Sequence, residues 1–104
     1  MDHGAQIPKL TQSIVSHFAP ERVILFGSYA RGAAEPDSDV DLLVIMPLRG
    51  MSRHQQTAAI YQQCHLGFPL DIVVRTPEEF EEGQKRRDWF LQEVAREGKV
   101  MYAA

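Results

Sequence analysis

Three aspartates stand where strands are expected to begin. Asp39 and Asp41 open an apolar run that continues to Ile45, and Asp71 opens a similar run further along the chain. Successive side chains of a strand point to opposite faces, so Asp39 and Asp41 share one face. Adjacent carboxylates repel one another unless a proton, a basic side chain or a metal ion neutralises them. A hard divalent cation suits such a cluster of oxygen ligands, with Mg²⁺ as the first choice and Mn²⁺ as the alternative.

A glycine–serine pair adds a second chemical feature. Gly27 and Ser28 follow an apolar strand candidate and precede a helical turn that contains Arg31. Glycine lets the backbone approach a ligand closely, and a serine hydroxyl can donate to a phosphate oxygen. Arg31 has two interpretations, because its guanidinium can reach a phosphate or pair with Asp37 or Asp39. A phosphate cradle facing three carboxylates predicts phosphoryl or nucleotidyl transfer assisted by two Mg²⁺ ions.

These features converge only if the strands of the sheet run in particular directions. The strand candidates cover residues 22–26, 39–45 and 69–75, and a helix is expected over about 52–66. The carboxylates converge if the second and third strands run parallel, with that helix as the crossover. The first strand must then run antiparallel to the second, so that its carboxyl end delivers Gly27 to the same edge. The pattern therefore predicts a mixed sheet.

The remaining segments complete an α/β (α+β) domain, a small mixed β-sheet flanked by helices. A helix is expected over 7–18, a helical region over 76–97 that is interrupted near Gly83, and a short edge strand over 99–102. The 52–66 helix is expected to end at Gly67. The last helix is expected to supply four core residues, which are Trp89, Phe90, Leu91 and Val94. An interface with a partner protein is the alternative place for Trp89.

Composition limits the classes of function. The 104 residues suggest one domain over 1–104, with residues 1–6 disordered. A net charge of −3 argues against a nucleic-acid substrate, because nucleic-acid tracks carry a basic excess. There is one cysteine, and no apolar run approaches the roughly 20 residues that span a bilayer. With no secretory signal at the N-terminus, we expect a cytoplasmic protein without a membrane partner.

The spacing of these motifs resembles a known family. Gly27-Ser28, ten further residues and then Asp39-Val40-Asp41 are similar to the pattern of the DNA polymerase β nucleotidyltransferase superfamily. Residues 27–32 and 38–42 resemble its minimal nucleotidyltransferase (MNT) branch, and Leu70-Asp71-Ile72 matches the third acid. The resemblance covers roughly residues 20–102 and implies a polymerase-β-like nucleotidyltransferase core.

The resemblance also implies roles for individual residues. In the family, two aspartates bind Mg²⁺, a third binds one metal and helps to activate the acceptor hydroxyl, and the serine contacts the nucleotide phosphates. These roles fall on Asp39, Asp41, Asp71 and Ser28, while Gly27 and Arg31 are candidate nucleotide contacts. Proteins that resemble this chain are commonly the antitoxin of a toxin–antitoxin pair, and the partner toxin is a helical HEPN-domain ribonuclease. The implied reaction transfers AMP from ATP to a tyrosine hydroxyl of that toxin.

Two other functions stay open at this point. The chain can act as a steric antitoxin that blocks its toxin without catalysis. It can also be a nucleotidyltransferase for small molecules, although no acceptor-binding domain is visible in the sequence. Template-directed polymerisation fits least well, because a primer-binding domain and a basic surface are both missing from the pattern.

Overall fold

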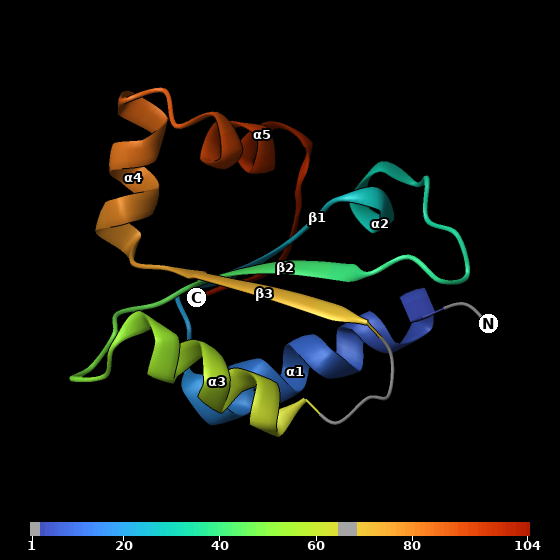
Figure 1. The fold of residues 1–104 in the computed structure, drawn as a ribbon, viewed down its shortest axis with the longest axis horizontal. Coiled ribbons are helices and arrows are strands. Elements are labelled where there is room, and N and C mark those ends of the chain that lie inside the picture. The colour runs from blue at the N-terminus through green and yellow to red at the C-terminus, as the bar shows by residue number, and fades with distance from the viewer. Residues whose placement is uncertain (1–2, 65–68) are drawn as a thin grey trace.

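A four-stranded mixed sheet lies at the centre of the structure, with helices on both faces (Figure 1). This computed structural model describes residues 3–64 and 69–104. The strand order is β3-β2-β1-β4. The strands are β1 (Arg22–Phe26), β2 (Val40–Ile45), β3 (Leu70–Arg75) and β4 (Lys99–Ala103). The expected class, a small mixed sheet flanked by helices, is confirmed.

The pairing of the strands brings the chemical motifs to one edge. β1 pairs antiparallel with β2 and with β4, whereas β2 pairs parallel with β3. Helix α3 (Arg53–Gln63) provides the crossover between the two parallel strands. The carboxyl end of β1 therefore lies beside the amino ends of β2 and β3, as the sequence predicted.

The helices divide between the two faces of the sheet. In Figure 1, α1 (Ile7–Phe18) and α3 lie below the sheet, and α4 (Pro77–Lys85) and α5 (Trp89–Glu97) lie above it. The short helix α2 (Ser28–Arg31) follows β1. One hydrophobic cluster packs the lower helices against the sheet, and a second packs the upper helices against its other face. The second cluster is formed by Ile24, Leu43, Ile45, Leu91 and Val94.

Two capping boxes and an ion pair fix the helices around the edge strand β3. Ser52 and Thr76 each accept the third backbone N–H of their helix, which supports the predicted start of α4. The Arg53 guanidinium pairs with the Glu79 carboxylate and also donates to the Val74 carbonyl at 2.9 Å. Hydrogen bonds from Arg53 are the main cause that lowers the pKa of Glu79 to about 2. The ion pair thus links helices from opposite faces of the sheet.

The break in the 76–97 region needs correction. The helix is interrupted at residues 86–88, where Arg87 has a φ of 59°, and not at Gly83. Gly83 is a buried residue inside α4, and a Cβ atom there would stand 2.3 Å from Leu91 Cδ1. Its missing side chain lets α5 pack closely against α4. The prediction that Gly83 breaks the helix was therefore wrong, since this glycine allows the two helices to pack closely.

The expected disorder at the N-terminus can be compared with the structure only from residue 3 onward. Residues 3–6 form a 3₁₀ turn and not a disordered tail, because they lead directly into α1, whose first residue Ile7 is buried. Met1 and Asp2 lie outside the described residues. The predicted helix end at residues 65–66 and its stop at Gly67 also lie outside them. Among the helices of the described ranges, none is long and apolar enough to cross a membrane.

We expect Leu43→Ala to destabilise the fold by about 3 kcal/mol, because it removes a buried side chain and leaves a cavity. Leu43 is fully buried on β2, between the site edge and α5. Chemical denaturation measures the free energy of unfolding. Val100→Ala is the control, since Val100 is 58% exposed on β4. Equal losses for the two variants would contradict this assignment of the core.

Candidate active site

Asp41 lies at the centre of the candidate site. It is paired in register with Phe26 of β1 on one side and with Asp71 of β3 on the other. Residues two apart on a strand share a face, so Asp41 projects on the same face as Leu43, towards the α4–α5 layer. Asp41 is half-buried, whereas Asp71 is exposed on the edge strand. The two carboxylates that the sequence predicted to converge are therefore side by side.

Gly27 approaches the Asp41 carboxylate more closely than any other residue type allows. Its φ is 74°, a conformation that side chains with a Cβ atom rarely adopt. A Cβ atom at this position would stand 2.2 Å from Asp41 Oδ2, well inside contact distance. The turn after β1 can reach the carboxylates only because residue 27 has no side chain.

The carboxylates at this edge perturb one another. The pKa of Asp41 is raised from 3.8 to about 6, mainly by burial and then by the negative charges of Asp71 and Asp39. A hydrogen bond with Asp71 acts in the same direction, while the positive charge of Arg31 lowers the pKa. The folded chain thus holds negative charges close together, and the positive charge of Arg31 compensates them only in part.

A divalent cation fits this donor set. Asp41 and Asp71 offer adjacent carboxylate oxygens whose repulsion a cation would relieve, and the Gly27 backbone lies directly against Asp41. Asp39 precedes β2, is exposed, and acts on Asp41 through its charge. Across residues 3–64 and 69–104, no three acidic, histidine or cysteine side chains stand close enough to form a complete metal site. The structure therefore brings Asp41 and Asp71 together, whereas Asp39 lies near them without forming a cluster of three ligands.

Ser28 and Arg31 both belong to helix α2, directly after the Gly27 turn. Gly27 is the N-cap residue of α2, so Ser28 is the first residue of the helix and not its cap. None of the described carboxylates lies within ion-pair distance of Arg31, so the expected alternatives of pairing with Asp37 or Asp39 are not observed. Gly32 ends the helix with a φ of 71°. Both polar side chains are thus available to a ligand at this edge.

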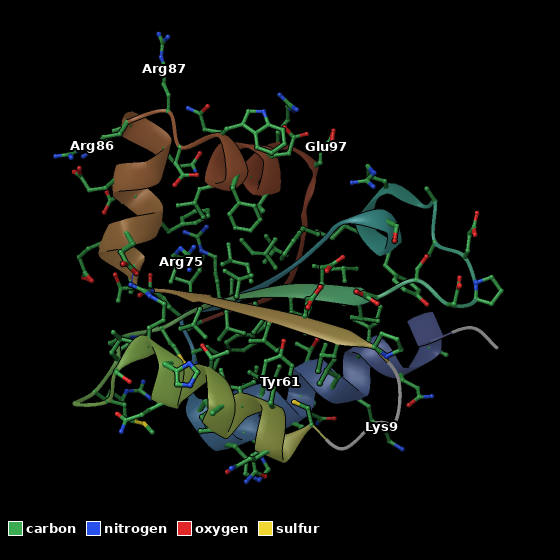
Figure 2. The ribbon with its side chains drawn as sticks, in the orientation of Figure 1. Lys9, Tyr61, Arg75, Arg86, Arg87 and Glu97 are labelled. Atoms are coloured by element: carbon green, nitrogen blue, oxygen red, sulfur yellow. The ribbon has the colours of Figure 1, made fainter. Side chains whose placement is uncertain are left out.

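Tyr61 supports the site and was not identified from the sequence. Its hydroxyl accepts the backbone N–H of Ile72 at 2.8 Å, next to Asp71. Figure 2 shows Tyr61 between α3 and β3. The contact satisfies an edge-strand N–H and holds the start of β3 in place. A tyrosine on the helix before a strand carries no distinctive signal in one sequence, because its partner is a backbone atom.

Trp89 does not lie in the core, which was the first of the two places expected for it. Its side chain is 75% exposed, whereas Leu91 and Val94 are buried. Trp89 begins α5 and lies on the same helix face as Glu93 and Glu97, four and eight residues later. The alternation of these residues with the buried pair was visible in the sequence and would have placed Trp89 on the charged face.

Comparison with known proteins decides the family. A family model described as "Nucleotidyltransferase domain" matches residues 7–91, which include every candidate site residue. The chain belongs to this nucleotidyltransferase family. The assignment made from the Gly27-Ser28 and Asp39-Val40-Asp41 motifs is confirmed at this level.

Two relatives of this nucleotidyltransferase come from Methanocaldococcus jannaschii. "Putative protein adenylyltransferase MJ1305" is 61% identical over 36 residues, which are 32% of this chain and 24% of that protein. "Putative protein adenylyltransferase MJ0604" is 32% identical over 85 residues, which are 79% of this chain and 78% of that protein. The second match extends over most of both proteins.

Two solved structures share the fold. A "putative nucleotidyltransferase" from Sulfolobus solfataricus matches with a TM-score of 0.65 and 22% identity over 96% of this chain and 79% of that chain. A structure described as "the toxin-antitoxin with AMP-PNP" matches with a TM-score of 0.58 and 21% identity over 97% of this chain and 73% of that chain. These matches confirm the expected nucleotidyltransferase fold.

We expect Gly27→Ala to disrupt the site more than Gly32→Ala does. Both glycines have a positive φ, but a Cβ atom meets Asp41 at position 27 and nothing within 4 Å at position 32. Backbone strain alone costs about 1 kcal/mol at either position. Thermal denaturation with and without Mg²⁺ measures both effects. Gly32→Ala should keep any stabilisation by Mg²⁺ and Gly27→Ala should lose it; identical behaviour would contradict the close contact with Asp41.

The raised pKa of Asp41 predicts a pH dependence of stability in the absence of divalent cations. Between pH 3.8 and about 6 the folded state binds more protons at Asp41 than the unfolded state, so this contribution to stability is lost as pH rises through that window. Asp41→Asn should remove the decline and stabilise the protein by about 1 kcal/mol at pH 7, a value discounted for solvent screening. Melting curves in EDTA measure the difference. Asp37→Asn, in the exposed loop, should leave the decline intact.

Proposed function

We propose that this nucleotidyltransferase is a Mg²⁺-dependent protein adenylyltransferase. In the proposed reaction it transfers AMP from ATP to a tyrosine hydroxyl of a HEPN-domain ribonuclease toxin and acts as its antitoxin. The observation that carries this proposal is the close approach of Gly27 to the Asp41–Asp71 pair. The Gly27–Ser28 turn lies against Asp41, whose partner on β3 is Asp71, and this supports a site in which the turn binds phosphates beside metal-binding carboxylates.

Each residue has a proposed part in binding or proton transfer. Asp39, Asp41 and Asp71 hold the Mg²⁺ ions, and Ser28 with Arg31 binds the phosphates. When bound, Mg²⁺ stabilises the charge on the transferred phosphoryl group and on the leaving pyrophosphate. Asp71 is exposed on the edge strand, where an incoming hydroxyl can reach it, and takes the hydroxyl proton. A bond forms between the tyrosine oxygen and the α-phosphorus as the bond to pyrophosphate breaks.

The comparisons support the choice of substrate classes. Both relatives from Methanocaldococcus jannaschii carry the name protein adenylyltransferase, and one structural neighbour is a toxin–antitoxin structure with AMP-PNP. The HEPN identity of the toxin and the tyrosine acceptor come from the resemblance to the MNT branch. An added AMP group carries bulk and negative charge, which oppose RNA binding by a ribonuclease.

The test is the intact mass of the partner. The protein encoded beside this gene is mixed with the chain, ATP and Mg²⁺, and its mass is recorded. We expect mass gains in whole AMP units with the wild type, and a loss of at least about a hundredfold in rate for Asp41→Asn, because a metal ligand and its charge are removed.

Asp37→Asn is the matched control, because Asp37 is an exposed aspartate in the loop before β2. It should transfer AMP at the wild-type rate. A stable complex with neutralised toxin and no mass gain would replace the proposal with the steric antitoxin. Mass gain on a small molecule but not on the protein would replace it with small-molecule nucleotidyl transfer.

A further inference from the structure

A pocket of about 210 Å³ opens beside the Gly27 turn. It lies between the end of β1, helix α2 and helix α5. Its lining combines apolar, acidic and basic side chains with the Gly27 backbone, and the residues used below are Gly27, Arg31, Trp89, Glu93 and Glu97. In Figure 2, Glu97 stands at the end of α5 that is turned towards α2. Gly27 and Arg31 already have roles in the proposed site, whereas Trp89, Glu93 and Glu97 have none.

Of the aromatic side chains that line the pocket, Phe26 and Phe90 pack against the second hydrophobic cluster, whereas Trp89 belongs to neither cluster. Trp89 is 75% exposed, more than any other large apolar side chain in the described ranges. Helix α5 is anchored by Leu91 and Val94, which are each only 2% exposed. An indole left open to water beside a pocket is typical of a surface that stacks on a flat ligand.

The pocket is continuous with the candidate active site. Gly27 lines the pocket and also faces the Asp41 carboxylate. Arg31 lines the pocket as well, and its charge acts on Asp41. A nucleotide whose phosphates lie at the Gly27–Ser28 turn therefore has the pocket beside it, on the sheet face that α5 covers.

The acidic residues of the pocket are arranged to accept hydrogen bonds. Glu93 and Glu97 follow Trp89 at four-residue spacing on one face of α5. Arg96 Nη2 lies 2.8 Å from Glu93 Oε1 and 3.8 Å from Glu97 Oε1, which offsets their charge. The second oxygen of each carboxylate remains an acceptor for an amino group.

We propose that this pocket binds the nucleobase of the donor nucleotide, stacked on Trp89, with Glu93 and Glu97 accepting from its exocyclic amino group. The inference rests on the proposed function, since it requires a nucleotide at the Gly27–Ser28 turn. The pocket suits a base better than a protein partner, because stable protein interfaces use about 20–30 residues on each side. It selects bases that carry an amino group over uracil.

The single tryptophan of the chain makes the pocket directly observable, because Trp89 is the only source of indole fluorescence. The full chain is titrated with ATP and, separately, with inorganic tripolyphosphate, both with Mg²⁺. We expect ATP to quench the emission of Trp89 and tripolyphosphate to bind without quenching. In calorimetry, Trp89→Ala should raise the Kd of ATP about tenfold and leave the Kd of tripolyphosphate unchanged.

Val100→Ala is the matched control, since Val100 is 58% exposed on β4 and does not line the pocket. It should change neither Kd. For base selection, CTP should bind about fivefold more tightly than UTP, because the two differ at the exocyclic amino group, and Glu93→Gln should reduce this difference. Melting curves of each variant establish that it is folded.

The outcomes separate this inference from the proposed function. ATP binding without quenching, with the same Kd in Trp89→Ala, overturns the base pocket and leaves the adenylyltransferase proposal standing. Quenching that requires the partner protein overturns it too, and makes Trp89 a protein contact. Failure of both ATP and tripolyphosphate to bind the wild type overturns the proposed function and the inference together.

Discussion

The contact between the Gly27 backbone and the Asp41 carboxylate is the constraint on which the rest of the site depends. The register of β1 and β2 sets Phe26 opposite Asp41, so the next residue must turn with a positive φ against the carboxylate. Burial and the charges of Asp71 and Asp39 make this edge unfavourable for the isolated chain, as the raised pKa of Asp41 indicates. Such an arrangement is reasonable where a bound cation and phosphates relieve it, and folded proteins tolerate it only on a rigid support.

That support comes from the sheet and its two hydrophobic clusters. β2 carries the site at its amino end and is buried from Leu42 to Ile45, with one cluster on each face. The parallel partner β3 is an edge strand, and it is held by Tyr61 from α3 and by the Arg53–Glu79 pair around its other end. Because β3 brings Asp71 to the site, contacts that look purely structural set the separation of the two carboxylates.

The strands and their directions could be predicted from the sequence, because apolar runs mark them and the motifs converge in only one arrangement. The sequence left the place of Trp89 open between the core and a partner interface, and the reason is physical. Trp89 is as apolar as its core neighbours, and only its spacing from Glu93 and Glu97 separates it from the Leu91–Val94 stripe. The purpose of Gly83 was likewise hidden, since the side chain it makes room for, Leu91, belongs to the next helix. Long-range contacts of this kind leave no local signal.

The central claim is that Asp41 and Asp71 hold a divalent cation beside a phosphate-binding turn. A crystal structure of the chain with Mn²⁺ and AMP-PNP tests it most directly, because anomalous scattering locates the metal independently of the surrounding atoms. The account predicts a Mn²⁺ peak bonded to oxygens of both aspartates, with the phosphates against Gly27 and Ser28. A metal peak elsewhere on the chain, or AMP-PNP with its phosphates away from that turn, would contradict it.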